Sequence, residues 1–237
     1  MKRLAFILAL LVVALSVQAD RRGLLTSKTG AAAATTFLLN QGFEGTGTDN
    51  GETWTLTSGS PIEDPDNTEF AITGSQNLVL RRSGGTTADA WSYFAAYGGT
   101  TNQSIVFGYG VIQTTTTNAA HVLFYCRTNT TTQNFVRVNS NARLQVFSSN
   151  GAVSASPADA IGTNTTVHIY WGVNNTTGTG FVEWNTTKSF SGSGSKYAAF
   201  TGGQTGMLLN NLSLRAAVAA TTNWMDNIKI SPTAFTP

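Results

Sequence analysis

Three carboxylates stand close together in NQGFEGTGTDNGETW, residues 40–54: Glu44, Asp49 and Glu52. Carboxylates at short spacing can form a catalytic acid–base pair, hold a hard cation such as Ca²⁺, or face water in a turn. A catalytic pair is disfavoured, because a glycine-rich turn separates Glu44 and Glu52 into two different predicted strands. Two interpretations remain open: a cation site, and a hydrogen-bonded turn without a cation.

Aromatic rings beside polar groups are the second pattern with a chemical use. Sugar sites place aromatic faces against the C–H-rich faces of pyranose rings, and amides and carboxylates bind the hydroxyls. The segment AWSYFAAY contains Trp91, Tyr93 and Tyr97, and strand alternation would put Trp91 and Tyr93 on one face. Glu183 and Trp184 form a second pair. We predict that these five residues bind carbohydrate, while the same rings are also typical of a sandwich core.

The single cysteine and the two histidines lie outside any recognisable catalytic arrangement. Cys126 falls in the apolar run VLFYC, which is typical of a buried thiol, and one cysteine excludes an internal disulfide. His121 and His168 lie in apolar runs, and the sequence has no G-x-S-x-G turn whose serine either histidine could activate. We interpret both as hydrogen-bonded structural histidines.

The first 19 residues, MKRLAFILALLVVALSVQA, have the basic start, apolar run and small-residue end of a secretory signal peptide. The apolar run is short for a membrane span of about 20 residues. We therefore expect cleavage after Ala19, no membrane association afterwards, and a secreted, cell-surface or periplasmic protein. An uncleaved N-terminal anchor is the alternative.

Charge is scarce in this chain, at 11% of 237 residues against about 25% in an average soluble domain. Cleavage of the signal peptide would remove two of the 14 basic residues and leave 12, which balance the 12 acidic ones. A basic stripe of the kind that neutralises phosphates is missing from the sequence, so we expect no nucleic-acid partner. A neutral chain of low charge also tolerates self-association.

Short apolar runs, separated by clusters of Gly, Asn, Thr and Ser, follow a flexible leader at residues 20–35. This spacing predicts an all-β fold, one jelly-roll sandwich of two antiparallel sheets spanning residues 36–237. The expected strands are 36–40, 51–56, 76–82, 90–96, 103–112, 120–127, 134–139, 143–148, 166–173, 180–185 and 224–230. Residues 212–220 could form either a short helix or a strand. EDPDNTE is predicted to be a loop because of its proline and asparagine.

Several of these runs resemble a known superfamily when they are taken in order. They are FEG with a tryptophan in the next strand, then GSQNLVL, then TVHIYWGVNNTTGTGFVEWN, and a terminal MDNIKIS. Together they resemble the concanavalin A-like lectin/glucanase jelly roll, which includes laminin-G-like modules, from Phe37 to Ser231. Galactose-binding-like jelly rolls share the FE opening and the DNI closing strand, and are the close alternative.

The resemblance implies that the first and last strands pair, and that a structural Ca²⁺ lies between them. The matching positions are Glu44 and Asp226, with Asp49 as a third carboxylate. Glucanases of this superfamily carry E-x-D-x-E or E-x-D-x-x-E on one strand, whereas the corresponding strand GFVEWN has Glu183 alone. We therefore expect no enzyme activity.

A second acidic cluster, Glu63, Asp64 and Asp66, could be a metal loop or a solvated turn. For the molecule as a whole, we predict a secreted, non-catalytic carbohydrate-binding module with a polysaccharide or glycan partner. The alternative is a structural or adhesive subunit of an extracellular or surface assembly, a fibre, coat or surface layer, without sugar binding. An enzyme with an unrecognised site ranks last.

Overall fold

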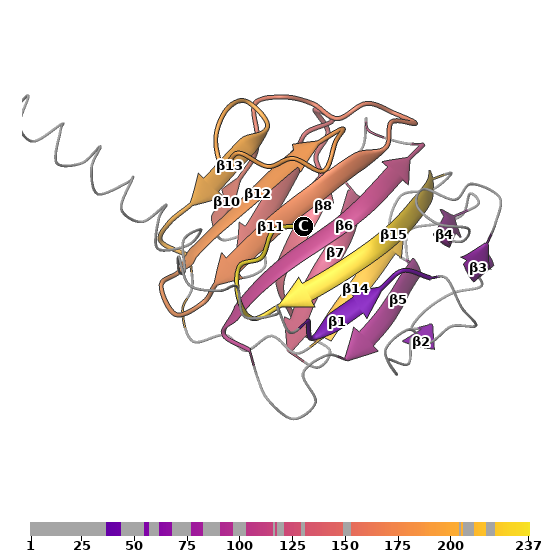
Figure 1. Ribbon diagram of the computed structural model, residues 1–237, viewed down its shortest axis with the longest axis horizontal. Helices are drawn as coiled ribbons and strands as arrows, with labels where there is room; N and C mark the ends of the chain where they lie inside the picture. Colours follow the sequence, from indigo (N-terminus) through magenta and orange to yellow (C-terminus); the bar gives the residue numbers. More distant parts are fainter. Residues whose placement is uncertain are drawn as a thin grey trace, which may run out of the picture.

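A computed structural model shows the chain as a sandwich of two β-sheets (Figure 1). It describes residues 37–43, 55–56, 62–67, 77–82, 91–96, 103–115, 117, 121–128, 131–148, 153–203, 205, 211–216 and 221–237. Within these ranges there is no helix, and hence no helix long and apolar enough to cross a membrane. The predicted signal peptide and leader, residues 1–35, lie outside the described residues.

The first sheet has eight strands, in the order β13-β12-β11-β6-β15-β4-β3, with β1 pairing on β15. Its strands are β1 (Leu39–Gln41), β3 (Ile62–Asn67), β4 (Asn77–Arg82), β6 (Ile105–Thr114), β11 (Val167–Asn174), β12 (Thr179–Asn185), β13 (Tyr197–Phe200) and β15 (Thr221–Ser231).

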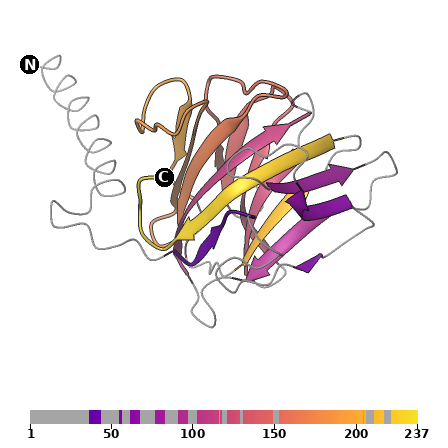
Figure 2. The same cartoon turned by 45° about the vertical axis from the view of Figure 1, so that its right-hand side comes forward.

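The second sheet has seven strands, in the order β10-β9-β8-β7-β14-β5-β2. Its strands are β2 (Thr55–Leu56), β5 (Trp91–Ala96), β7 (His121–Thr128), β8 (Thr131–Val138), β9 (Leu144–Ser148), β10 (Val153–Ala155) and β14 (Asn211–Ala216). All pairings in both sheets are antiparallel. Figure 2 shows the two sheets facing each other across the core.

The first and last described strands pair as the sequence predicts. Leu39 lies opposite Ile230, and Gln41 lies opposite Ile228. The predicted hairpin at NNTTGT is also confirmed, because β11 and β12 are antiparallel neighbours. The Asn174 side-chain oxygen accepts the amides of the next turn residues, and Gly178 adopts φ +68°, which glycine reaches at little cost.

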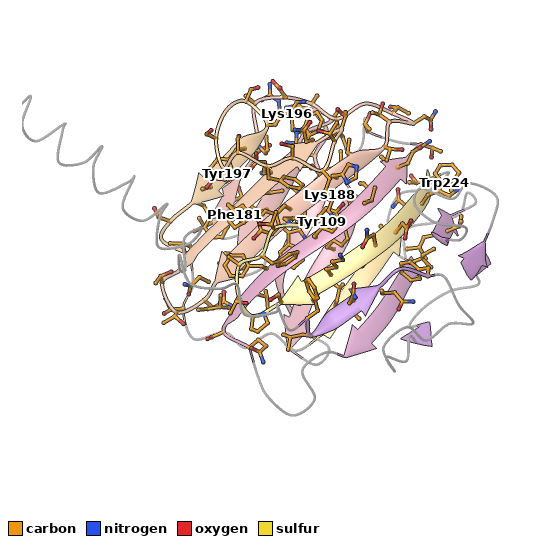
Figure 3. The ribbon with its side chains drawn as sticks, in the orientation of Figure 1. Tyr109, Phe181, Lys188, Lys196, Tyr197 and Trp224 are labelled. Atoms are coloured by element: carbon orange, nitrogen blue, oxygen red, sulfur yellow. The ribbon has the colours of Figure 1, made fainter. Side chains whose placement is uncertain are left out.

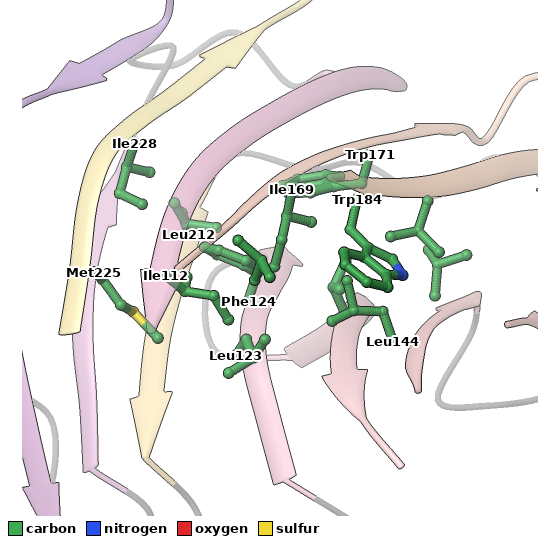
Figure 4. Close-up of a cluster of buried hydrophobic side chains, with 14 of the residues drawn as sticks. Ile112, Leu123, Phe124, Leu144, Ile169, Trp171, Trp184, Leu212, Met225 and Ile228 are labelled. Atoms are coloured by element: carbon green, nitrogen blue, oxygen red, sulfur yellow. The ribbon is translucent and has the colours of Figure 1, made fainter. Parts of the chain in front are cut away.

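The core lies between the sheets and contains two tryptophans (Figure 4). Trp171 is 1% exposed and packs against Phe124 of β7, with ring centroids 6.3 Å apart. It fits there because Gly108 of β6 has no side chain: a Cβ at that position would lie 2.0 Å from the Trp171 ring. In the run FGYGV, alternation along the strand therefore places the glycines toward the core and the larger side chains on the outer face.

Three strands, β3, β10 and β13, are not expected from the sequence. The segment around Pro65, predicted to be a loop, forms strand β3 at the edge of its sheet. Its register on β4 shifts between Asp64 and Asn67, and an edge strand with such an irregularity tolerates a proline. Residues 211–216 form strand β14, which is one of the two alternatives expected there. The edge strands β10 and β13, of three and four residues, are too short to be recognised in the sequence.

Candidate functional site

The outward face of the eight-stranded sheet carries the candidate site, and Figure 1 looks onto this face. One cross-strand row of outward side chains runs over five strands. In order from β13 to β15, it contains Tyr197, Glu183, Tyr170, Tyr109 and Lys229. Two further rows lie beside it on β11, β6 and β15. They contain His168, Val111 and Asp226, and then Thr166, Gln113 and Trp224.

One half of this face is covered by an aromatic cluster. We call it the outer aromatic cluster, and its members are Phe37, Phe107, Tyr109, Tyr170, Phe181, Phe190, Tyr197 and Phe235. Phe235, from the C-terminal segment that runs back over the sheet, packs on Phe37 and Tyr170 at centroid distances of 5.0 and 5.5 Å. Its amide also donates to the Tyr170 hydroxyl at 3.4 Å. This half of the face is therefore closed by the protein itself.

The segment after β12 covers the same cluster and is held by a buried carboxylate. Glu183 is 4% exposed, and its Oε1 accepts the Ser191 amide at 2.7 Å. Its Oε2 accepts the Gly192 amide at 2.8 Å, and the Ser191 hydroxyl adds a longer bond to Oε1 at 3.3 Å. Charge-assisted bonds to two backbone amides stabilise a buried carboxylate and fix the loop that carries Phe190 and Lys188.

A β-bulge in β15 determines which of its side chains face outward. Asp226 pairs with Val111, but three residues later Lys229 pairs with Tyr109, so one extra residue is inserted between them. Asn227 adopts φ +51° at this point, and its amide donates to Asp226 Oδ1 at 2.5 Å. The bulge keeps Ile228 in the core while Asp226 and Lys229 share the outer face.

At the margin of the outer aromatic cluster, the buried Tyr109 and the partly exposed His168 form a pair. The Tyr109 hydroxyl and His168 Nδ1 are 2.7 Å apart, and the two rings are stacked with centroids 6.1 Å apart. Lys188 Nζ lies 5.7 Å from the centre of the Tyr109 ring. Figure 3 shows Lys188 beside Tyr109, whereas Lys196 lies apart from them near the top of the view.

Burial and neighbouring charges decide the protonation states in this group. Burial raises the pKa of Tyr109, and the Asp226 carboxylate raises it further, so the phenol keeps its proton. Burial, and then the positive charge of Lys188, lower the pKa of His168. A protonated phenol donates to Nδ1 of a neutral imidazole, which leaves the His168 Nε2–H as a donor for another partner.

A polar strip continues from this pair to the end of β15. The outer polar strip comprises Gln113, Thr166, His168, Lys188, Trp224 and Lys229. Thr166 donates to the Gln113 side-chain oxygen at 3.1 Å, and Gln113 lies opposite Trp224 in the β6–β15 register. Trp224 is partly exposed, and Figure 3 places it at the far end of the strip. His168 and Trp224 lie two strands apart, roughly 10 Å, so the strip is longer than one sugar ring.

The predicted site residues lie in different places. Asp226 is fully buried at the bulge, while Glu44, Asp49 and Tyr97 lie outside the described residues. Trp91 and Tyr93 are in β5 of the other sheet, and their side chains are also outside the described part. The predicted metal and carbohydrate-binding roles of these six residues stay predictions.

Glu183 and Trp184, predicted to act together, point to opposite faces of β12. Trp184 is 6% exposed within the core between the sheets, and Glu183 is enclosed by the loop on the outer face. They therefore do not form one sugar-stacking surface. Among the described residues, no group of three or more His, Cys, Asp or Glu could hold a metal ion.

Most of the outer polar strip was missed by sequence reasoning, although a signal for it exists. In QSIVFGYGVIQ and TVHIYWGV, alternate positions are polar or aromatic, and these positions face outward. In WMDNIKI the apolar core positions Met225, Ile228 and Ile230 are spaced by three and then two residues. That break in alternation indicates a bulge and predicts the outward position of Lys229.

Comparison with known proteins identifies the fold only. No protein-family model and no curated protein sequence matches the chain. Among solved structures, the chain is similar to the cellulose induced protein Cip1, with TM-score 0.60 and 14% identity over 84% of this chain and 99% of that one.

Two larger proteins are similar as well. The binding domain of botulinum neurotoxin DC, solved in complex with SialylT, matches with TM-score 0.58 and 9% identity over 84% of this chain and 48% of that one. A sialidase matches with TM-score 0.53 and 8% identity over 75% of this chain and 17% of that one. The chain thus spans about half of the toxin fragment and about a sixth of the sialidase. The sheet order and these similarities show that the chain has a lectin-like jelly-roll fold.

Proposed function

We propose that this protein is a secreted, non-catalytic carbohydrate-binding module, and that it binds an oligosaccharide along the outer polar strip. The observation that carries the proposal is the partly exposed Trp224, the cross-strand partner of Gln113, on the same sheet face as His168. A ring with neighbouring amide and imidazole groups provides stacking and directed hydrogen bonds, which sugar recognition requires. The jelly-roll fold supports this reading, and the signal-like N-terminus supports secretion.

A glycan array followed by calorimetry tests the binding function. We expect the protein to bind at least one oligosaccharide on the array. Trp224→Ala should weaken that binding by about tenfold or more, because truncation of a central aromatic ring commonly costs more than 1 kcal/mol. The control Tyr197→Phe changes an aromatic of the covered half and should bind normally. No binding to any glycan would overturn the proposal.

Glu183 supports the non-catalytic part of this proposal. It is the carboxylate in the strand where the related glucanases place their catalytic residues, and both of its oxygens accept backbone amides. A nucleophile or general acid must instead reach the substrate. Hydrolysis of a polysaccharide panel that Glu183→Gln abolishes would contradict this assignment.

A structural Ca²⁺ is a further part of the proposal. Asp226 is fully buried at the bulge of β15, the strand that β1 pairs with, and a buried carboxylate requires donors or a cation to offset its desolvation. Carboxylate and backbone oxygens are the ligands that Ca²⁺ prefers, so this residue type fits the ion. We propose Glu44 and Asp49 as the other carboxylates of the site.

The alternative function, a subunit of an extracellular or surface assembly, is favoured by one observation. Strand β13 forms an edge of the eight-stranded sheet, and its Ala198 and Ala199 are at least partly exposed. An exposed edge can pair with a strand of another copy. Ala198→Lys should then dissociate any oligomer seen by size-exclusion chromatography, while glycan binding would be unaffected.

A further inference from the structure

Three nitrogen groups that can carry positive charge lie near Tyr109, where the outer polar strip meets the outer aromatic cluster. Lys188 Nζ lies over the Tyr109 ring, and His168 is hydrogen-bonded to the Tyr109 hydroxyl. Lys229 is the cross-strand partner of Tyr109, and its Nζ lies 5.4 Å from the centre of the neighbouring Phe37 ring. The chain has only 14 Lys and Arg among 237 residues. A concentration of this kind in a weakly charged chain indicates a local requirement for positive charge.

The carboxylates in the same region are buried, and their oxygens accept backbone amides. Glu183 is bound to the Ser191 and Gly192 amides, and Asp226 is fully buried with an oxygen on the Asn227 amide. Within the described part of the chain, neither Lys188 nor Lys229 forms an ion pair with a carboxylate. Acidic oxygens therefore lie inside while ammonium groups lie outside, with Lys188 exposed and Lys229 partly exposed.

The like charges also repel one another in the absence of a partner. Lys188 lowers the pKa of His168 and also the pKa of Lys229, in both cases after the larger effect of burial. An anion placed between these groups would remove that repulsion, and a partly desolvated site strengthens the attraction. The site is therefore electrostatically complementary to a negative group.

We propose that the outer polar strip binds saccharides that carry a carboxylate, with the sugar carboxylate held by Lys188, Lys229 and the His168 Nε2–H. This inference rests on the proposed carbohydrate-binding function and specifies its ligand class. Trp224 and Gln113 contact neighbouring, uncharged parts of the oligosaccharide. Because a bound anion favours the imidazolium form of His168, binding tightens as pH falls through the His168 titration. The titratable groups around His168 are Tyr109 of β6, Asp226 of β15 and Lys188 of the loop after β12.

Titration calorimetry with matched charged and uncharged ligands tests the ligand class. The probes are trimers of galacturonic, glucuronic and mannuronic acid and sialyllactose, each beside its methyl ester, which keeps the sugar and removes the charge. A sulfated κ-carrageenan tetrasaccharide distinguishes carboxylate from sulfate. We expect at least one acid to bind about tenfold more tightly than its ester, as a charge-assisted hydrogen bond would produce. This preference should shrink between 0.05 and 0.5 M NaCl.

Two lysine variants locate the effect. Lys188→Gln should reduce the preference for the acid over its ester about tenfold, whereas Lys196→Gln, a lysine of the same segment that lies over the Trp184 ring, should leave it unchanged. Equal binding of acids and esters would overturn the inference and leave the proposed function standing. Equal or tighter binding of the sulfated probe would overturn the carboxylate assignment. No binding to any probe or to the glycan array would overturn both.

Discussion

At the residue scale, the tyrosine–histidine pair shows how burial assigns proton positions. Tyr109 keeps its proton because burial and Asp226 disfavour the phenolate, and His168 stays neutral because burial and Lys188 disfavour the imidazolium. The sequence predicted a hydrogen-bonded histidine within a strand, and this is confirmed for His168. It did not predict the partner, because Tyr109 and His168 are 59 residues apart.

Replacement of Lys188 should change the titration of His168. We expect Lys188→Gln to raise the pKa of His168 toward its usual value of about 6.5, since a repelling charge is removed. NMR can follow the imidazole, because the chain has only two histidines. Lys196→Gln is the control, and an equal shift in that variant would show that the effect is not local.

The same lowered pKa makes folding stability depend on pH. Because the folded state holds the proton of His168 less tightly than the unfolded state, acidification favours unfolding. Stability should therefore fall as pH drops below about 6.5 and continue to fall until the folded-state pKa is passed. Urea denaturation at several pH values should show a smaller decline in the free energy of unfolding for His168→Gln than for the wild type. An identical decline in that variant would exclude His168 as the source.

Glu183 should stabilise the loop that it holds. Glu183→Gln places an amide N–H group against a backbone N–H donor, so we expect a loss of about 1–3 kcal/mol in the free energy of unfolding. Asp159→Asn is a matched carboxylate-to-amide control, because its described side-chain partner is the Ser195 hydroxyl, for which an amide oxygen can substitute. Equal losses in the two variants would contradict a special role for Glu183.

At the element scale, glycine alternation in β6 and the bulge in β15 determine which side chains lie on each face of the eight-stranded sheet. Gly108 gives room to Trp171 in the core, while its neighbours Phe107 and Tyr109 face outward. Strand positions and the first-to-last pairing could be predicted, since apolar runs and turn residues are local signals. Strand β3 could not, because an edge strand with a proline and three acids reads as a loop.

Filling the space beside Trp171 should destabilise the sandwich. In Gly108→Ala the new Cβ would lie 2.0 Å from the indole ring, so the ring or the strand must move. Overpacking of this kind typically costs about 1–3 kcal/mol, measurable by urea denaturation. Thr187→Ala, in the exposed loop, should change stability by less than about 0.5 kcal/mol. A wild-type midpoint in Gly108→Ala would contradict the described packing.

The C-terminal segment should protect the outer aromatic cluster. Phe235→Ala removes contacts with Phe37 and Tyr170, and we expect a loss of about 1–3 kcal/mol in unfolding free energy, less than for a residue between the sheets. Burial raises the pKa of Tyr170 to about 12, so this pKa should fall toward 10 in the variant. An unchanged phenol titration by ultraviolet absorbance would show that the segment does not cover Tyr170.

At the scale of the whole molecule, a jelly roll covers half of one sheet face with its own loop and C-terminal segment, and leaves His168, Lys188, Trp224 and Lys229 at least partly exposed beside it. The fold class followed from composition and strand spacing, and the structure confirms it. The exposure of these four residues did not follow, because burial of a sheet face depends on loops that return from distant parts of the chain. Glu183 illustrates this point, since only the loop at Ser191 explains its burial.

A structural cation between the first and last strands would stabilise the entire sandwich by mass action. We expect EDTA to lower Tm and excess CaCl₂ to restore it, with a shift of several degrees. Asp226→Asn should reduce the dependence of Tm on Ca²⁺. Identical melting curves with EDTA and with CaCl₂ would contradict the proposed calcium site.

The central claim is that the outer polar strip binds a saccharide, and one measurement tests it most directly. That measurement is the calorimetric affinity of the wild type, Trp224→Ala and Tyr197→Phe for the best oligosaccharide from the array. We expect Trp224→Ala to bind at least about tenfold more weakly, corresponding to about 1.4 kcal/mol, and Tyr197→Phe to bind as the wild type does. Equal affinity of all three proteins would contradict it.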